Sequence, residues 1–489
     1  MTKLAERLIP PEILAHLRRS RGNREIWLVG GALRDHFLGR PHPDLDFVVD
    51  REAANLARAV ADELNADFYV LDGERDAARV ILTGEVRTLD FVRRRGPSIE
   101  ADLQDRDFTI NSLALALDDA DRLIDPLRGL QDLKDRRLRA CGGKSLERDP
   151  VRALRAVRLT SELGLRMEPG TVRQVRRAGK ELSTSPGERV RDEFMRSLDP
   201  LNAGKGIRLM NHLGLLSIVC PELTEILGPE EVGWQRALST LDRLGELVGL
   251  LGQRFDDERA ENLALGELSL LLGRYRPQIG EKLTSPVGGG RQSGQLLALA
   301  ALYCTEVRGS SAARENVAAH SAELAYRRCQ ELRLSRPEAD RVRRIVRNHW
   351  RPEALAAGGR PGDGDTYRFF RDTGEAGVEL ILLFLAGYLA GLTPPPPPEE
   401  WRAKLGVART LMEAWFDRTD QVIRPPKLLG GDELAAALGL QPGPIIGHLL
   451  EQIREAQAEG AIRSKEAALE FARRQLVLGE GPDLSDRPT

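Results

Sequence analysis

The apolar pattern of this chain changes near residue 145, and the change constrains the fold more than any other feature of the sequence. Before it, short segments rich in β-branched and aromatic residues end at Gly, Asp or Pro, which is typical of strands: EIWLV, LDFVV, DFYVL, ARVIL and RTLDFV. One segment among them, EAANLARAVADELN, has helical spacing. After residue 145 the helical spacing continues to the end. We therefore predict the α+β class, with a mixed β-sheet and helices first and an all-helical remainder.

Composition shifts divide the chain further. We predict an α+β domain over residues 1–140, helical segments over 141–200 and 201–392, and a helical C-terminal segment over 401–489. Between the last two, TPPPPPEE at 393–400 is typical of a stiff polyproline linker.

The composition favours a soluble protein of the cytoplasm. Its longest uncharged apolar run, LILLFLAGYLAGL, has 13 residues, and a membrane span needs about 20, so we predict a buried helix and no membrane partner. The four cysteines are scattered without a CxxC pair, which argues against a zinc site or a disulfide framework. The net charge of −2 excludes no partner, because a basic groove can lie within a balanced total.

A double glycine follows the first predicted strand and precedes a helix. A turn at Gly30 and Gly31 would let phosphate oxygens approach the backbone, and the helix start adds free N–H groups and a positive dipole end. Arg34, on the first turn of that helix, could reach a phosphate. The alternative is an ordinary strand–turn–helix corner, which is what a double glycine by itself favours.

Two aspartates stand at alternate positions of the next strand, DLDFVVD. Asp44 and Asp46 then point to one face, roughly 7 Å apart, where their repulsion would be relieved by a cation. Such carboxylates can hold two Mg²⁺ ions about 3.5–4 Å apart, which activate a hydroxyl and hold a leaving pyrophosphate. Solvated aspartates on an exposed strand are the alternative. The glycine turn just upstream favours the metal site.

A further carboxylate, Asp90, lies in the strand TLDFV. A third acid beside the pair would suit a base or a metal ligand for a nucleophilic hydroxyl. A structural strand aspartate fits the pattern equally well.

The segment RDPVRALRAVR combines a helix start with a charged stripe. Asp149 and Pro150 are typical of an N-cap and a first helical residue. Asp149, Arg152, Arg155 and Arg158 then recur at every third position, on one side of a helix. The spacing fits a solvated arginine face as well as a binding face.

Basic residues are concentrated around this segment. Residues 131–158 hold nine Lys or Arg against four Asp or Glu, and residues 166–196 hold eight against five. Such clusters can follow an RNA backbone by neutralising its phosphates, and a solvated helical face is the alternative.

Several motifs occur together in a fixed order over residues 28–198: GGALRD, DLDFVV, TLDF, SIEADLQDRDFTINSLAL, LIDPLRGLQDL, RDPVRALRAVRL and ERVRDEFMRSL. In this combination the chain resembles the class II tRNA nucleotidyltransferase and bacterial poly(A) polymerase family, within the polymerase β-like superfamily. Weaker similarity covers GIRLMNHLGLLSIVCPEL and resumes at LLGGDELAAALGLQPGPIIGHLLEQI. The resemblance implies a nucleotidyltransferase head over 1–140, then a neck, a body and a tail.

The resemblance implies template-independent addition or repair of the 3′-terminal CCA of tRNA from CTP and ATP, with Mg²⁺. A CC-adding enzyme, an A-adding enzyme and a poly(A) polymerase stay open as alternatives. A non-catalytic RNA-binding protein is an alternative of another class, disfavoured by the retained Asp44 and Asp46. A small-molecule nucleotidyltransferase is disfavoured by the long basic helical region.

The resemblance also assigns residues in the head. Asp44 and Asp46 would bind metal, and Gly31 and Arg34 would contact the triphosphate. Arg106 would contact the nucleotide, with Asp107 and Asn111 shaping the sugar pocket; the sequence letters are RDFTIN.

In the neck, the resemblance implies that Asp149 and Arg152 act as a protein template for the base edge of CTP or ATP. An aspartate accepts from an exocyclic amine, and an arginine donates to ring nitrogen or carbonyl acceptors. Arg155 and Arg158 would face the nucleotide more generally. The family usually has Glu-Asp-x-x-Arg, and here Arg148 stands in the first position, with Glu147 before it. The helix start in PGPIIGHLLEQI is a possible tail contact with a tRNA phosphate, or an ordinary capped helix.

Overall fold

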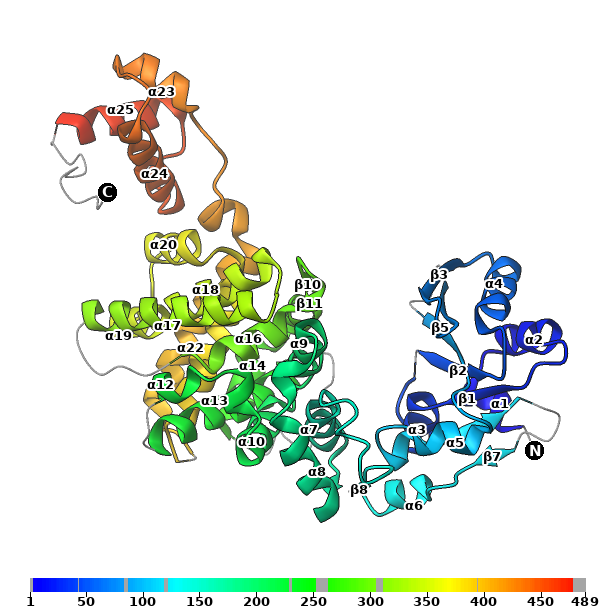
Figure 1. The fold of residues 1–489 in the computed structure, drawn as a ribbon. Coiled ribbons are helices and arrows are strands. Elements are labelled where there is room, and N and C mark those ends of the chain that lie inside the picture. Colours follow the sequence, from blue (N-terminus) through cyan, green and yellow to red (C-terminus); the bar gives the residue numbers. More distant parts are fainter. Residues whose placement is uncertain are drawn as a thin grey trace. The chain divides into compact units, whose positions relative to one another are not determined.

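A computed structural model describes the chain over residues 3–42, 44–82, 87–117, 122–227, 231–251, 263–304, 311–393 and 395–477 (Figure 1). The chain divides into two compact units. Unit 1 consists of Met1–Glu193 and Leu209–Ile218, and unit 2 consists of Phe194–Arg208 and Val219–Thr489. The sheet lies in unit 1, so the predicted order of an α+β part followed by a helical part is confirmed.

Unit 1 is built on a seven-stranded mixed sheet of order β3-β4-β5-β2-β1-β6-β7. The strands are β1 (Ile26–Val29), β2 (Leu45–Val49), β3 (Asp67–Asp72), β4 (Ala77–Leu82), β5 (Arg87–Arg93), β6 (Ala114–Ala116) and β7 (Leu123–Ile124). β2 and β5 run parallel, and the other neighbours are antiparallel. The five predicted strands are confirmed. β6 and β7 were not predicted, because two or three residues are too few to show an alternating pattern.

Helices cover the sheet and continue through the predicted neck at 141–200. They are α1 (Leu4–Leu8), α2 (Pro11–Ser20), α3 (Gly31–Phe37), α4 (Ala53–Leu64), α5 (Ile99–Gln104), α6 (Gly129–Lys134), α7 (Arg152–Leu163), α8 (Pro169–Gly179) and α9 (Gly187–Arg196). A short parallel pair joins β8 (Arg137–Leu138), which precedes α7, to β9 (Arg166–Met167), which lies between α7 and α8.

One face of the sheet packs against α5. Trp27, Val48 and Leu103 belong to one buried apolar cluster there. Because Trp27 pairs with Val48 and Val29 pairs with Asp46, the same face continues from apolar residues to Asp46 at the start of β2. The sheet therefore presents a carboxylate at the edge of its own core.

From α10 onward the described chain is almost entirely helical. The helices are α10 (Ala203–Leu213), α11 (Leu216–Val219), α12 (Leu223–Leu227), α13 (Glu231–Leu251), α14 (Leu263–Leu272), α15 (Arg276–Thr284), α16 (Ser293–Ala301), α17 (Ser311–Glu331), α18 (Arg336–Asn348), α19 (Arg351–Ala357), α20 (Asp363–Thr373), α21 (Gly377–Ala390), α22 (Pro398–Asp417), α23 (Gly431–Leu438), α24 (Pro444–Ala458) and α25 (Lys465–Val477). A two-residue hairpin pairs β10 (Pro286–Val287) with β11 (Arg291–Gln292). Gly214, whose φ is +75°, ends α10 and separates it from α11.

The apolar run after Glu379 forms the buried helix α21, as predicted. The described residues contain one stretch long and apolar enough to cross a membrane, Asp363–Ala390. Most of this stretch is buried within unit 2, as in the core helix of a soluble protein.

The proline-rich segment joins two packed helices. Pro398 begins α22, and Trp401 of α22 stacks on Tyr388 of α21 with ring centroids 6.0 Å apart. Helices α23–α25 enclose a separate apolar cluster that includes Leu434 and Ile453. The segment at 393–400 thus lies inside unit 2, and the division into head, neck, body and tail stays a prediction.

Candidate functional site

The glycine corner lies directly against one of the predicted metal-binding acids. β1 ends at Val29, Gly30 adopts φ +75°, and α3 begins at Gly31. A Cβ on Gly30 would stand 3.3 Å from Arg106 Nη1 and 3.5 Å from Asp46 Oδ2. The positive φ and these two polar neighbours together favour glycine at this position. The predicted strand–turn–helix corner is confirmed, and it shares one site with Asp46 and Arg106.

The predicted acids are brought together by strand register. Asp46 pairs with Val29 of β1 on one side and with Asp90 of β5 on the other. Since neighbouring strands lie about 4.8 Å apart, Asp46 and Asp90 stand side by side on one face. Asp44 lies just before β2 and accepts a hydrogen bond of 2.6 Å from Thr88 Oγ1.

The charge of this cluster is incompletely compensated. Burial, reinforced by the nearby Asp90 and Asp44 carboxylates, raises the pKa of Asp46 to about 6. Arg106 and Arg79 oppose the rise, but Arg79 is held by Asp90 through two hydrogen bonds of 2.7 Å. Among the described residues no ion pair or hydrogen bond holds the Asp46 carboxylate. The cluster therefore has an excess of negative charge that a cation would relieve.

The donor set fits a hard divalent cation. Mg²⁺ is usually bound by one or two carboxylates together with substrate phosphates, and Asp44 and Asp46 provide two carboxylates beside the glycine corner. Within the described part of the chain, no three or more His, Cys, Asp or Glu side chains form a complete metal site by themselves. Asp90 faces Arg79 rather than a shared ion position, so its predicted role as base or third ligand stays a prediction.

Arg34 and two residues of RDFTIN, Asp107 and Asn111, belong to one hydrogen-bonded network. Arg34 Nη1 donates to Asn111 Oδ1 at 2.8 Å, and Asn111 Nδ2 donates to Asp107 Oδ1 at 3.1 Å. Arg155 Nη1 then donates to Asp107 Oδ2 at 3.0 Å. Burial raises the pKa of Asp107, but Arg155 and Asn111 outweigh it and hold the pKa below its ordinary value. This hydrogen-bonded network thus links α3 to α7.

Glu193 is a buried acid that the sequence analysis did not single out. It is 3% exposed and accepts from Arg155 Nε at 3.0 Å and from Arg158 Nε at 2.9 Å. Although burial raises its pKa, Arg158 and Arg155 bring the pKa below its ordinary value. The sequence signal for its burial is the apolar pair FM that directly follows Glu193 in ERVRDEFMRSL. The two arginines of the stripe are therefore paired and partly buried, not a solvated face.

The prediction that Asp149 caps the helix is wrong. α7 begins at Arg152 after Val151, and no side chain caps it. The Asp149 carboxylate is instead engaged by Arg189, whose Nη2 lies 2.7 Å from Oδ2, and by Arg152, whose Nε lies 3.7 Å from Oδ2. Asp149 Oδ1 is buried and has no hydrogen-bond partner among the described residues. An unpartnered buried carboxylate oxygen is an acceptor available for a ligand N–H.

Arg148 and Glu147, where the sequence differs from the usual family pattern, pair with residues other than Asp149. Arg148 pairs with Asp105, and Glu147 accepts from Arg177 at 2.8 Å. Glu147 thus does not join Asp149, and Arg152 Nη1 is held by the carbonyl oxygen of Ser145 at 3.1 Å.

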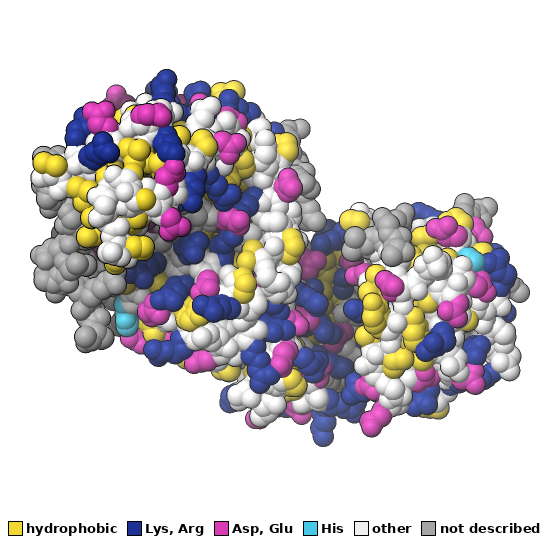
Figure 2. Space-filling view, turned by 90° about the horizontal axis from the view of Figure 1, so that it is seen from above, with side chains coloured by type: hydrophobic (Ala, Val, Ile, Leu, Met, Phe, Trp, Pro, Cys, Tyr) yellow, Lys and Arg dark blue, Asp and Glu magenta, His cyan; other side chains and the backbone are white. Residues whose placement is uncertain are grey.

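Basic and acidic side chains are mixed on both units, as Figure 2 shows for one face. In the basic stretch 166–196, Arg177 and Arg189 both pair with acids, as does Arg191, which contacts Asp192 at 2.8 Å. The predicted RNA-binding surface is therefore less positive than the residue counts indicate.

Comparisons with known proteins identify the family. The Poly A polymerase head domain family matches residues 26–139, and the family described as probable RNA and SrmB-binding site of polymerase A matches residues 164–227. The CC-adding tRNA nucleotidyltransferase of Geobacter sulfurreducens is 32% identical, over 96% of this chain and 96% of its own. The A-adding tRNA nucleotidyltransferase of Deinococcus radiodurans is 33% identical, over 91% and 94%.

A solved structure shows the same fold. The Thermotoga maritima CCA-adding enzyme complexed with tRNA aligns with a TM-score of 0.61 and 21% identity, over 97% of this chain and 99% of that one. The head-domain match and the full-length identity to two curated relatives together show that this chain belongs to the tRNA nucleotidyltransferase family and is a nucleotidyltransferase.

Proposed function

We propose that this enzyme adds nucleotides to the 3′ end of tRNA in the cytoplasm, building or repairing all or part of the terminal CCA from CTP and ATP. The observation that carries the proposal is that the Asp46 carboxylate lies 3.5 Å from where a Cβ on Gly30 would stand, so a phosphate-binding turn and a cation-binding acid lie side by side. The identity to curated relatives that are named for tRNA nucleotide addition supports the choice of substrate.

Asp44 and Asp46 would hold Mg²⁺, which when bound lowers the pKa of the terminal 3′-hydroxyl and stabilises the departing pyrophosphate. The N–H groups at the start of α3 would receive the triphosphate, because a helix N-terminus favours anions. Arg106, whose guanidinium lies beside Gly30, would add positive charge at the same place.

Base selection is assigned to Asp149 and Arg152. The unpartnered Asp149 Oδ1 can accept from the exocyclic amine that cytosine and adenine share. Uracil has a carbonyl group at the corresponding position, so an acceptor there disfavours UTP. Arg152, 3.7 Å from Asp149, would donate to the neighbouring ring acceptor.

We expect Arg152→Ala to lower discrimination between CTP or ATP and UTP or GTP by about 10- to 100-fold, because each base-edge contact contributes about 1–3 kcal/mol of selectivity. The KM for triphosphate should change less than the ratio of kcat/KM values. The check is single-nucleotide incorporation with each of the four triphosphates. Arg148→Ala removes an arginine that pairs with Asp105 and serves as the control. An unchanged four-nucleotide profile for Arg152→Ala would refute the assignment.

A partial activity has specific support. Relatives that match more than nine tenths of this chain are named CC-adding or A-adding, whereas a relative named multifunctional CCA protein matches 54% of it. This pattern favours addition of CC or of A alone.

The deciding experiment uses two tRNA substrates, one ending at the discriminator base and one ending in CC, with CTP, ATP or both. A CC-adding enzyme extends only the first substrate, with CTP. An A-adding enzyme extends only the second, with ATP. A complete enzyme extends both and builds CCA on the first. A long A tract indicates a poly(A) polymerase. No incorporation with Mg²⁺ or Mn²⁺ would refute the proposed function.

A further inference from the structure

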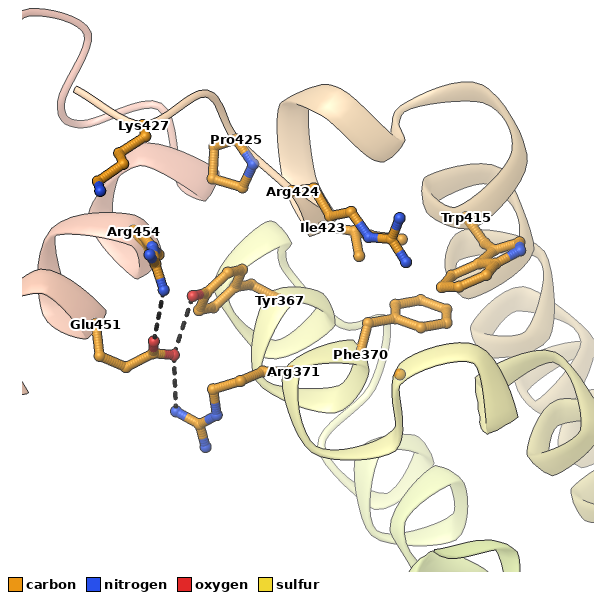
Figure 3. Close-up of a pocket in the computed structure, with 11 residues that line it drawn as sticks. Tyr367, Phe370, Arg371, Trp415, Ile423, Arg424, Pro425, Lys427, Glu451 and Arg454 are labelled. Carbon is orange, nitrogen blue, oxygen red and sulfur yellow. Dashed lines mark hydrogen bonds and ion pairs between the residues drawn. The ribbon is translucent and has the colours of Figure 1, made fainter. Parts of the chain in front are cut away.

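A cavity of about 350 Å³ opens in unit 2, outside the residues matched by either family (Figure 3). Its walls come from α20, α22, α24, the π-turn η6 (Thr419–Ile423), which follows α22, and the segment 424–427 directly after η6. The volume is in the range of pockets that hold small ligands, about 300–1,000 Å³. None of the residues assigned to nucleotide addition contributes to it.

One end of the cavity is aromatic. The rings of Phe370 and Trp415 lie 5.1 Å apart, and the Arg424 guanidinium lies over the Trp415 ring at 6.0 Å (Figure 3). The π-turn sets this position, since Arg424 N donates to Thr419 O at 2.7 Å across five residues. Single π-turns are frequent at functional sites. A flat ring and a flat cation together form a platform for a nucleic-acid base.

The other end is charged, with Arg371, Arg454 and Lys427 around Glu451 (Figure 3). Glu451 accepts from Tyr367 Oη at 2.9 Å, and the nearest nitrogens of Arg371 and Arg454 lie 3.6 and 3.7 Å from its carboxylate. No acidic side chain pairs with Lys427, or with Arg424 at the aromatic end, among the described residues. Cations without acidic partners beside a ring favour an anion that carries an aromatic group.

A neighbouring cavity of about 380 Å³ is also lined by basic side chains, of which Lys282 and Arg341 pair with Glu375 of the same lining at 3.3 and 2.8 Å. Lys282 lines that second cavity and also lies 6.0 Å from the Trp415 ring. Arg344 lines it too, and its Nη1 lies 3.0 Å from where a Cβ of Gly374, a residue of the first cavity, would stand. The two cavities therefore adjoin, and basic side chains line both of them. This continuity favours a nucleic-acid strand over a free mononucleotide.

We propose that the first cavity holds an unpaired nucleotide of the RNA substrate, with its base against Phe370 and Trp415 and its flanking phosphates at Arg424 and Lys427. The proposal rests on the proposed function only in taking RNA as the substrate. The cavity belongs to unit 2, whereas the glycine corner and its acids belong to unit 1, so the site is built from other residues than the proposed site of nucleotide addition. Stacking on one aromatic platform and two phosphate contacts would together strengthen tRNA binding by more than about tenfold.

The test compares tRNA binding by the full-length protein and by Arg424→Gln/Lys427→Gln, without CTP or ATP, over a series of salt concentrations. We expect the double variant to bind tRNA at least about tenfold more weakly. The slope of log K against log salt should fall by about 1.4, about 0.7 for each lost single-strand phosphate contact. Arg409→Gln removes a cation of α22 that lies outside the cavity, and its affinity and slope should match those of the unchanged protein. An unchanged affinity and slope in the double variant would overturn the proposal.

A second measurement separates a strand from a free nucleotide. Trp415→Ala removes the platform, and Trp415→Phe keeps a ring. We expect Trp415→Phe to retain most tRNA affinity and Trp415→Ala to lose it, while CMP and AMP up to millimolar concentration leave tRNA binding unaffected. Displacement of tRNA by either mononucleotide at low concentration would overturn the strand assignment. If the unchanged protein binds tRNA in a cavity-dependent way but adds no nucleotide, the proposed function fails and the cavity assignment survives.

Discussion

Asp46→Asn is expected to abolish incorporation of both CTP and ATP while tRNA binding is retained. Asn removes the charge that would hold Mg²⁺ beside the glycine corner, and metal catalysis contributes several kcal/mol of transition-state stabilisation. Since each 1.36 kcal/mol is a factor of ten, the rate should fall by about 10³-fold or more. Primer extension on tRNA measures the loss, and filter binding measures the tRNA affinity. Asp67→Asn, on β3 of the same sheet, is the control and should keep its activity.

The same substitution should make the metal-free protein more stable at neutral pH. The pKa of Asp46 is raised from 3.8 to about 6, so the folded state binds the extra proton and wild-type stability falls as pH rises from about 4 to 6. Above pH 6 the cost is constant, and it amounts to as much as about 3 kcal/mol. Asn has no such cost, so Asp46→Asn should unfold at higher temperature than wild type at pH 7.5.

Mg²⁺ provides the reverse comparison. A ligand that binds only the folded state stabilises it, so added Mg²⁺ should raise the melting temperature of the wild type and not of Asp46→Asn. If added Mg²⁺ raises the melting temperature of the wild type no more than that of Asp46→Asn, Asp46 does not bind the metal. Near-normal rates in Asp46→Asn would contradict the metal assignment directly.

The sequence could predict the parts of this site that are set by local geometry. The turn at Gly30 follows from a strand, two glycines and a helix in immediate succession, and Asp46 lies on the predicted strand at Leu45–Val49. The shared face of Asp44 and Asp46 stays a prediction, because Asp44 lies just before this strand. The pairing of Asp46 with Asp90 could not be predicted from the sequence, because parallel pairing of β2 with β5 depends on how distant strands assemble.

The segment from Asp149 to Glu193 shows where sequence patterns mislead. An Asp before a Pro favours a helix cap locally, but Arg189, 40 residues away in the sequence, engages the Asp149 carboxylate. Likewise, arginines at every third position are compatible with a solvated stripe, but in the structure Glu193 pairs with Arg155 and Arg158. In both cases a long-range ion pair overrides the local preference, and only tertiary contacts reveal it.

Removal of Arg155, the central arginine of this network, should destabilise unit 1 more than removal of Arg158. Arg155 is paired with both Asp107 and Glu193, which are 5% and 3% exposed. Arg155→Met leaves two buried carboxylates short of positive charge, and breaking a buried pair from one side costs about 3–5 kcal/mol. Arg158→Met leaves Asp107 paired and should cost less. Hydrogen exchange of α7 peptides under native conditions measures the stability of this region.

The pH dependence distinguishes lost charge pairing from lost packing. The pKa values of Asp107 and Glu193 lie below their ordinary values, so in the wild type their stabilising contribution is present above about pH 4.5 and is lost as pH falls through the folded pKa values. Without Arg155 both pKa values should rise, because burial then acts with less opposition. The destabilisation of the variant relative to the wild type should therefore grow as pH rises through the carboxyl range, and it should be greatest at neutral pH. A destabilisation that is the same at pH 5 and pH 7.5 would mean that Arg155 contributes through packing of its side chain and not through the two buried charges.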